Sequence, residues 1–225
     1  MVGVILAAGY GKRLAKISGN TSKCLIELNG TCLIDHNIQL LVHFGVERIV
    51  IVIGHNGGHI RQHMMDHFPD LHITYAVQKP PRGIADAICC ALPEIGGSSF
   101  FMCLADEILV SPSIENLRSA FQKPGVEGVC GIVKSTVEQI TNAYTVDFNQ
   151  DGRIRQMKEK PRPEELYNNY RGTGYCLIRP ALAELAAQTP INQIRGEYEL
   201  VDWLSTGLGR GLKLMAAFAG EHSIN

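Results

Sequence analysis

Residues 2–14 read VGVILAAGYGKRL, a short apolar run that passes at once into small residues and then into cations. The apolar residues Val2 to Leu6 predict a first, buried β-strand. A glycine-rich turn directly after a strand lets the backbone approach a ligand closely, and the cations that follow can neutralise phosphate oxygens. The segment is neither the GxxxxGK[ST] loop nor the full GxGxxG motif. Its glycines alone fit a tight turn without a ligand equally well.

Strand-like and helix-like segments alternate downstream of this turn. Apolar residues recur at helical spacing from Ile34 to Val42, and residues 49–53, IVIVI, form another continuous apolar run. Helices are predicted over 58–68 and 84–92, and strands over 72–77 and 100–104. This β-α-β rhythm predicts parallel strands that are covered by helices.

The second half of the chain is less regular. A strand-like segment at 126–133 precedes two more, 144–148 and 154–158, which lie on either side of the turn sequence NQDGR and predict a β-hairpin. Further helices are expected from Ser113 to Phe121, from Pro180 to Gln188 and from Glu199 onward, and LKLMAAFA at 212–219 predicts a closing strand. The fold predicted is a single three-layer α/β domain over 1–225, with a Rossmann-like, mixed but mostly parallel sheet, helices on both faces and a small β-hairpin extension.

Composition excludes several classes of protein. Of 225 residues, 45% are hydrophobic and 19% charged, which excludes a disordered chain. The formal net charge of -1 removes the electrostatic case for a nucleic-acid or membrane-surface binder. The 7 cysteines form no CxxC pair and favour reduced thiols in the cytoplasm. The apolar N-terminal stretch is too short to span a membrane.

Seven short motifs follow one another along the chain: LAAGYGKRL, SKCLIELNGTCLI, QKPPRGIADAI, LADEILV, KEKP, GTGYCLI and GEYELVD. In this order they resemble the sugar-phosphate nucleotidyltransferases, the family of glucose-1-phosphate thymidylyltransferase and the related uridylyl, cytidylyl and guanylyl enzymes. The resemblance covers Val2 to about Ala219. It implies that a sugar 1-phosphate oxygen attacks the α-phosphorus of a nucleoside triphosphate (NTP), releasing pyrophosphate and forming a nucleotide-sugar. It also implies a nucleotide-binding part at about 1–110 and a sugar-phosphate-binding part at about 111–225.

The resemblance implies a role for each nucleotide-site residue. Arg13 would hold the triphosphate and stabilise the leaving pyrophosphate, and Lys23 would neutralise phosphates at the reacting centre. Gln78 and Gly83 stand where a pyrimidine-contacting pair stands in thymidylyltransferase-like members, and a glutamine amide matches the imide edge of thymine or uracil, which favours dTTP or UTP. The doubled proline beside them also fits a rigid loop without a base contact. The full set of nucleotide contacts would be Leu6, Ala7, Ala8, Gly9, Gly11, Lys12, Arg13, Gln78 and Gly83.

The metal site would involve Asp106, which follows the apolar strand FFMCL at the strand's carboxyl end, where open α/β sheets bind their ligands. Its hard carboxylate suits Mg²⁺, the expected cofactor. The family takes a second metal ligand from a segment after the closing strand, where Asn225 falls in this chain, and Asp202 is the fallback. Because phosphoryl transfer needs charge stabilisation more than a protein nucleophile, Arg13, Lys23 and Asp106 are the expected catalytic residues. The abrupt end at Asn225 favours a truncated or fused chain.

The sugar-phosphate site would lie in the second half of the chain. By the resemblance, Glu159 in KEKP accepts hydrogen bonds from sugar hydroxyls, Lys160 contacts the phosphate, and Thr173 and Gly174 line the same pocket. Tyr144 stands where many relatives have a glycine that contacts the sugar. It would narrow or reshape the site, so smaller or modified phosphates, including phospho-alcohols, stay open beside a sugar 1-phosphate.

Three other functions stay open at this point. One is a CTP- or GTP-using member of the family with an unusual acceptor, and another is a non-catalytic regulatory subunit that binds a nucleotide-sugar. A molybdopterin cofactor nucleotidyltransferase shares the opening motif, but Gly11, KEKP and GTGYCLI argue against it. The joint presence of Arg13, Lys23 and Asp106 favours the enzyme. Relatives assemble as monomers, dimers or tetramers, which leaves a homo-oligomer open.

Three histidines repeat every four residues at His59, His63 and His67, so they share one face of the predicted helix. Such spacing can hold zinc, but HIRQH lacks the glutamate of the HExxH motif. A solvated or packing face is the better interpretation. For the cysteines, core packing is likewise the expectation, because nothing places a base near any one thiol.

Overall fold

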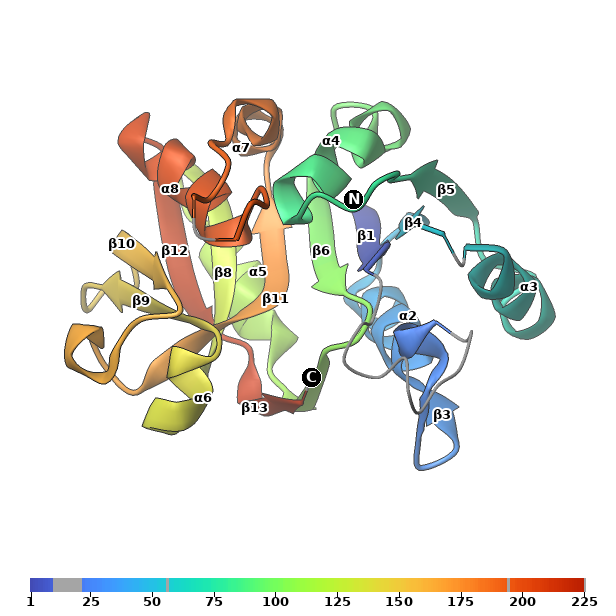
Figure 1. Ribbon diagram of the computed structural model, residues 1–225, viewed down its shortest axis with the longest axis horizontal. Helices are drawn as coiled ribbons and strands as arrows, with labels where there is room; N and C mark the ends of the chain where they lie inside the picture. The colour runs from blue at the N-terminus through green and yellow to red at the C-terminus, as the bar shows by residue number, and fades with distance from the viewer. Residues whose placement is uncertain (10–21, 56, 194, 225) are drawn as a thin grey trace.

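The computed structural model describes residues 1–9, 22–55, 57–193 and 195–224. Its centre is one large mixed sheet, in the strand order β10-β9-β11-β6-β1-β4-β5, with β8 pairing β11 and β12 (Figure 1). Strands β5, β4, β1 and β6 are parallel, whereas β11 runs antiparallel to β6, β8 and β9. The strands are β1 (Val2–Ala7), β4 (Arg48–Ile53), β5 (Ile73–Val77), β6 (Phe100–Leu104), β8 (Val126–Lys134), β9 (Tyr144–Phe148), β10 (Ile154–Glu159), β11 (Tyr170–Ile178) and β12 (Lys213–Phe218).

Helices and two short ribbons surround the sheet. One ribbon pairs β2 (Glu27–Leu28) with β3 (Thr31–Cys32), and the other pairs β7 (Ile108–Pro112) with β13 (Gly220–Ile224). The α-helices are α2 (Leu33–Phe44), α3 (Gly57–His67), α4 (Ile84–Ile95), α5 (Ile114–Phe121), α6 (Val137–Thr141), α7 (Pro180–Ala183) and α8 (Leu200–Gly209). Short 3-10 helices are η1 (Lys23–Leu25), η2 (Pro163–Glu165) and η3 (Glu184–Gln188). Within the described ranges, no helix is long and apolar enough to cross a membrane.

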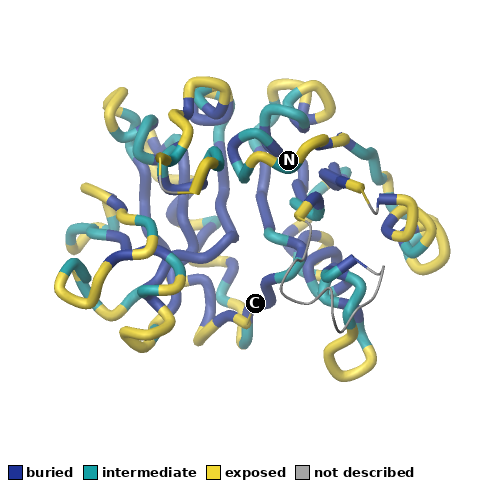
Figure 2. The backbone as a smooth tube through the Cα atoms, viewed as in Figure 1, coloured by how far each residue is buried: buried dark blue, intermediate teal, exposed yellow. Residues whose placement is uncertain are grey.

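The sheet separates two apolar cores because side chains along a strand alternate between its faces. In β4, Val50 and Val52 belong to the core shared with α4, α7 and α8. Ile49 and Ile51 belong to the core shared with α2, α3 and α5. The buried strands form the dark centre of the tube in Figure 2, and the exposed positions lie mainly in the peripheral helices and turns. The three-layer α/β prediction is confirmed.

The predicted elements are present with small shifts at their ends. The hairpin around NQDGR forms between β9 and β10. Helix α4 continues past the predicted end at Leu92 and through Pro93 to Ile95, and the helix expected over Pro180 to Gln188 divides into α7 and η3.

The central strand β11 was not predicted, because its glycines lower the intrinsic tendency to form a strand. The structure explains why Gly172 is there. A Cβ atom at this position would lie 1.8 Å from Cε2 of Tyr144, so the tyrosine ring fills the space of the missing side chain. The ribbons β2–β3 and β7–β13 were also not predicted, since both are short and their pairing depends on tertiary contacts.

Candidate active site

Lys23 and Asp106, which lie 83 residues apart in sequence, form an ion pair in the structure. The Lys23 Nζ atom donates to Asp106 Oδ2 at 2.7 Å, and the two side chains are 26% and 38% exposed. Asp106 lies just beyond the carboxyl end of β6, and Lys23 opens η1. An acceptor and a cation are therefore held together at the edge of the sheet where ligands of open α/β folds bind.

The start of the glycine-rich turn lies at the same edge. Strands β1 and β6 are parallel neighbours, and Ala105 N donates to Leu6 O at 3.1 Å. Ala8 is buried, and a Cβ on Gly54 would lie 2.6 Å from the Ala8 carbonyl oxygen, so the residue that follows β4 must be a glycine to leave room for the Ala8 backbone. Among the described residues, no atom beyond those of Gly9 and its chain neighbours lies within 4 Å of the position that a Cβ on Gly9 would take. The predicted contacts Gly11, Lys12 and Arg13 lie outside the described residues.

The loop after β5 fixes the amide of Gln78. This side chain is buried, and its Nε2 donates to Gly83 O at 2.9 Å and to Asp86 Oδ2 at 2.8 Å. Both amide hydrogens are thereby used within the protein. No hydrogen bond from a described residue reaches the carbonyl Oε1, which is therefore the atom that Gln78 can offer a ligand.

Gly83 is required where this loop meets the second half of the chain. It adopts φ +110, and a Cβ would lie 2.5 Å from the carbonyl oxygen of Tyr198. The contact is reinforced from both sides, because Tyr198 N donates to Arg82 O at 2.7 Å and Ala85 N donates to Tyr198 O at 3.0 Å. The QKPPRGIADAI and GEYELVD motifs are therefore one docked unit.

A charged group forms where β10 ends. Arg195 places Nη1 3.5 Å from Glu159 Oε1 and Nε 2.9 Å from Glu199 Oε1. Burial, together with the nearby carboxylate of Glu199, raises the pKa of Glu159 to about 7, although Arg195 and Lys160 oppose the rise. Burial also raises the pKa of Glu199. Lys160 has a positive φ of 41, and its backbone N donates to Ala143 O at 2.7 Å.

The raised pKa of Glu159 makes stability depend on pH. The folded protein holds this proton more tightly than the unfolded chain, in which a glutamate has a pKa of about 4.3. The stabilisation is present below that value and is lost as the pH rises toward 7. Glutamine carries no titratable proton, so Glu159→Gln should not lose this stabilisation. We expect the unfolding free energy of Glu159→Gln minus that of wild type to be about 2–3 kcal/mol larger at pH 8 than at pH 5. Urea denaturation at both pH values, with the exposed Glu138→Gln as control, measures this; a pH-independent difference would contradict it.

Tyr144, Thr173 and Gly174 are buried, and their polar atoms are bonded within the protein. The Tyr144 hydroxyl donates to Thr173 O at 2.7 Å, and Thr173 Oγ1 donates to Gly131 O at 2.9 Å. Gly174 N donates to Glu107 Oε2 at 2.6 Å. Tyr144 thus packs between β9 and β11 and fills space within the core. A contact between these three residues and a substrate stays a prediction.

Glu107, which directly follows Asp106 and was not predicted as a site residue, is a buried carboxylate with several partners. It is buried, accepts from Gly174 N, and accepts from Ser223 Oγ at 2.5 Å. Arg171 Nη1 lies 3.7 Å from its Oε1. Burial raises the pKa of Glu107, and the Ser223, Gly174 and Arg171 contacts lower it. The acid next to Asp106 therefore ties β6, β11 and β13 together.

A family model described as "Nucleotidyl transferase" matches residues 2–221. The chain belongs to the nucleotidyl transferase family. The resemblance inferred from the motifs is thereby confirmed.

Two relatives of this nucleotidyl transferase come from Haloferax volcanii. UTP--glucose-1-phosphate uridylyltransferase AglF is 30% identical over 202 residues, covering 89% of this chain and 80% of its own length. Low-salt glycan biosynthesis nucleotidyltransferase Agl11 is 30% identical over 213 residues, covering 94% of this chain but only 58% of its own length. A solved structure of UDP-glucose pyrophosphorylase complexed with UDP-glucose superimposes with a TM-score of 0.86 at 21% identity, covering 99% of this chain and 91% of that chain, which supports the fold.

The second metal ligand of this nucleotidyl transferase stays a prediction. Asn225 lies outside the described residues, and Ile224 before it pairs with Ile108, two residues after Asp106. The fallback, Asp202, accepts from Asn192 Nδ2 at 3.0 Å and raises the pKa of Glu159. Asp202 therefore belongs to the charged group at the end of β10, and no contact among the described residues joins it to Asp106.

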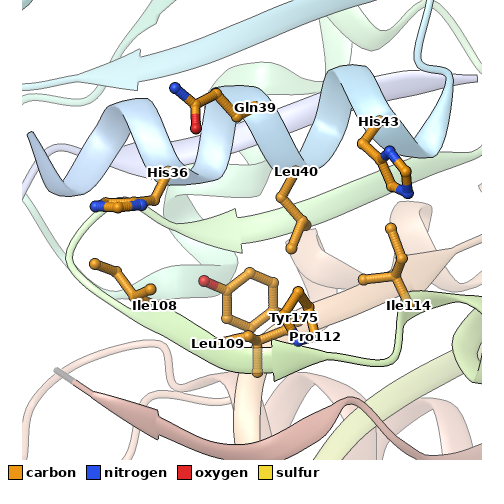
Figure 3. Close-up of a pocket in the computed structure, with 9 residues that line it drawn as sticks. All are labelled: His36, Gln39, Leu40, His43, Ile108, Leu109, Pro112, Ile114 and Tyr175. Carbon is orange, nitrogen blue, oxygen red and sulfur yellow. The ribbon is translucent and has the colours of Figure 1, made fainter. Parts of the chain in front are cut away.

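A separate pocket of about 320 Å³ lies between α2 and β7 (Figure 3). Its lining includes His36, Leu40 and His43 of α2, faced by Leu109 and Tyr175. Of the predicted site residues that the structure describes, none lines it. The pocket is therefore distinct from the Lys23–Asp106 site.

Proposed function

We propose that this nucleotidyl transferase moves a nucleotidyl group from an NTP to a sugar 1-phosphate or a similar phospho-alcohol, with release of pyrophosphate. The observation that carries the proposal is the Lys23–Asp106 pair beside the start of the glycine-rich turn. The nucleotide would bind to the part at about 1–110 and the acceptor to the part at about 111–225. The docking of Gly83 against Tyr198 joins the two.

Both reactants are polyanions, so the site must first overcome their repulsion. One pair of like charges about 4 Å apart costs about 4 kcal/mol at an effective dielectric constant of 20. Lys23 supplies a cation at the correct edge of the sheet, and Arg13 would supply a second one on the triphosphate. Positioning and charge stabilisation then account for catalysis without a protein nucleophile.

The residues at this edge fit Mg²⁺ as the cofactor. Asp106 offers a partly exposed carboxylate, a hard oxygen donor, and Lys23 contacts its Oδ2. Asp106 would hold the ion together with Asn225. When bound, Mg²⁺ neutralises phosphate charge and polarises the phosphoryl group. Lys23 can then turn from the carboxylate to the phosphates, because its long side chain has three rotatable donors.

The Gln78 amide supports a uracil or thymine base. Because both of its hydrogens are bonded to Gly83 and Asp86, the side chain presents an acceptor. The N3 position of uracil and thymine is a donor, whereas that of cytosine is an acceptor, so UTP or dTTP would donate from N3 to this oxygen and CTP could not donate to it from that position.

Replacing Gln78 with alanine tests this base preference. We expect kcat/KM for UTP or dTTP to fall about 10- to 100-fold and the value for CTP to change little, because a lost specific hydrogen bond contributes about 1–3 kcal/mol. Initial rates with each triphosphate, with the exposed Gln122→Ala as control, measure the effect. An equal loss for all three would contradict a contact with the base edge.

Glu159 and Lys160 support an acceptor that carries hydroxyl and phosphate groups. In its ionised form Glu159 accepts hydrogen bonds from hydroxyls, and the Lys160 ammonium group complements a phosphate. The 7 cysteines are all free, which fits a cytoplasmic enzyme. We expect small-molecule partners, a homo-oligomer at most, and neither nucleic acid nor a membrane as a ligand.

The decisive experiment measures Mg²⁺-dependent pyrophosphate release with dTTP, UTP, CTP, GTP and ATP, each against sugar 1-phosphates and phospho-alcohols. We expect turnover with one pyrimidine triphosphate and one acceptor class. Turnover with CTP or GTP would identify the alternative donor, and tight binding of a nucleotide-sugar without turnover would identify a regulatory subunit. Neither turnover nor binding across the panel would overturn the proposal.

A further inference from the structure

Three side chains of different chemistry converge away from the Lys23–Asp106 pair. The Cys32 Sγ, an Asp35 carboxylate oxygen and a His63 ring nitrogen all lie within 4.8 Å of one another. His63 Nε2 is 2.7 Å from Asp35 Oδ1. The side chains of His63 and Asp35 are only 14% and 12% exposed, and Cys32 is buried. A thiol, a carboxylate and an imidazole thus share one shielded position.

Two helices bring these groups together: Cys32 and Asp35 lie at the start of α2, and His63 lies on α3. Cys32 ends β3 and is the N-cap residue of α2, and its side chain makes no capping bond. Asp35 lies three residues later in the first helical turn, where i and i+3 positions share a face. His63 comes from the middle of α3. Glu27 pairs directly with Cys32 in the β2–β3 ribbon, so its carboxylate lies near the same position.

We propose that Cys32, Asp35 and His63 form a binding site for one Zn²⁺ ion, whose fourth ligand is water or Glu27. Thiolate, imidazole and carboxylate are the ligand types that zinc takes in proteins, whereas Mg²⁺ avoids sulfur. Binding replaces the thiol proton of Cys32 with the metal ion, and the proton passes to solvent. No residue of the proposed catalytic machinery takes part.

The geometry requires two adjustments, because the His63–Asp35 contact must open, and any pair of ligand atoms near the 4.8 Å limit must close by roughly 1 Å. Zinc bonds of roughly 2.0–2.3 Å in a tetrahedron place ligand atoms roughly 3.3–3.7 Å apart. The His63–Asp35 contact would therefore open by roughly 0.6 Å, and the hydrogen bond would be exchanged for two metal bonds. The Cys32 thiol would release its hydrogen bond to Leu25 O, at 3.4 Å.

The charges around the thiol support the proposal. Burial raises the pKa of Cys32, and the carboxylates of Asp35 and Glu27 raise it further. Without a cation these negative charges keep the proton on sulfur. A divalent cation neutralises them and pins α2 to α3 beside η1, the segment that carries Lys23.

Cobalt binding to the full chain tests the site. After chelation and dialysis under a non-thiol reductant, we expect one Co²⁺ per chain to give a thiolate-to-cobalt charge-transfer absorption that Zn²⁺ removes. Cys32→Ser should abolish the absorption, and His63→Gln should weaken Co²⁺ binding about 10-fold or more. Matched controls are Cys90→Ser, a half-buried cysteine of α4, and His59→Gln, one turn earlier on α3; both should bind as wild type does.

Absence of this absorption in wild type, or its persistence in Cys32→Ser, would overturn the site and leave an ordinary His63–Asp35 ion pair. If a variant fails to fold, X-ray absorption of the zinc-loaded wild type decides instead. One sulfur and three nitrogen or oxygen ligands support the proposal, whereas no sulfur, or several, contradicts it. These readouts do not depend on turnover, so they remain valid if the proposed transferase activity is absent.

Discussion

Asp106→Asn is expected to lower kcat/KM for nucleotidyl transfer about 10²–10³-fold, the loss typical of removing one element of transition-state charge stabilisation. Asparagine keeps the size of the side chain but removes the negative charge that would hold Mg²⁺. It also leaves Lys23 without its anionic partner at 2.7 Å. Steady-state pyrophosphate release at several Mg²⁺ concentrations measures the effect, and we expect a higher Mg²⁺ requirement together with the lower rate.

Asp147→Asn is the matched control, because Asp147 is also paired at 2.7 Å, with Arg155, but lies on β9. The pair at Asp106 is partly exposed and contributes about 0–1 kcal/mol to stability, so Asp106→Asn should unfold within about 1 kcal/mol of wild type. An Asp106→Asn protein with normal turnover and a normal Mg²⁺ requirement would exclude Asp106 as a metal ligand.

Glu107→Ala is expected to lower the free energy of unfolding by about 3–5 kcal/mol, a large share of the stability of a typical domain. The substitution removes the acceptor of two buried donors, the Gly174 N–H and the Ser223 hydroxyl, and it removes the carboxylate that faces the buried Arg171 guanidinium. Each unmet donor in a buried site carries a desolvation penalty, and a charged donor carries the largest. Urea denaturation followed by circular dichroism measures the change.

Glu221→Ala is the control for this prediction. Glu221 lies on β13 near Ser223, but it is exposed and accepts one bond from Ser111. Its loss should change the unfolding free energy by less than about 0.5 kcal/mol. A loss below about 1 kcal/mol for Glu107→Ala would mean that water replaces the missing carboxylate, and that the site does not depend on this network.

Most of the fold could be predicted from local sequence patterns. The IVIVI run of β4, the helical spacing of α2 and the NQDGR turn each determine an element without reference to the rest of the chain. Strand β11 could not be predicted this way, because Gly172 looks unfavourable until the ring of Tyr144 is placed against it. Local propensity and tertiary packing disagree there, and packing decides the structure.

The site could be predicted only where its residues belong to continuous motifs. Asp106 followed from its position after an apolar strand, and its partner Lys23 came from the family resemblance. The role of Glu107 depends on Ser223, 116 residues away, so no local pattern contains it. The cluster at His63 could not be predicted for the same reason, because its partners are on β3 and α2. The histidine repeat along α3 instead groups His63 with His59 and His67.

The pairing of β13 with β7 has a consequence for how the protein is made. When a ribosome has synthesised the chain through Glu107, it has not yet synthesised Ser223, whose hydroxyl donates to Glu107 in the finished protein. The nascent chain can form β1, β4, β5 and β6 at this stage. The Glu107 carboxylate has its Ser223 partner only after β13 has been synthesised. We infer that the carboxylate of Glu107 reaches its final set of contacts only after residue 223 has left the exit tunnel.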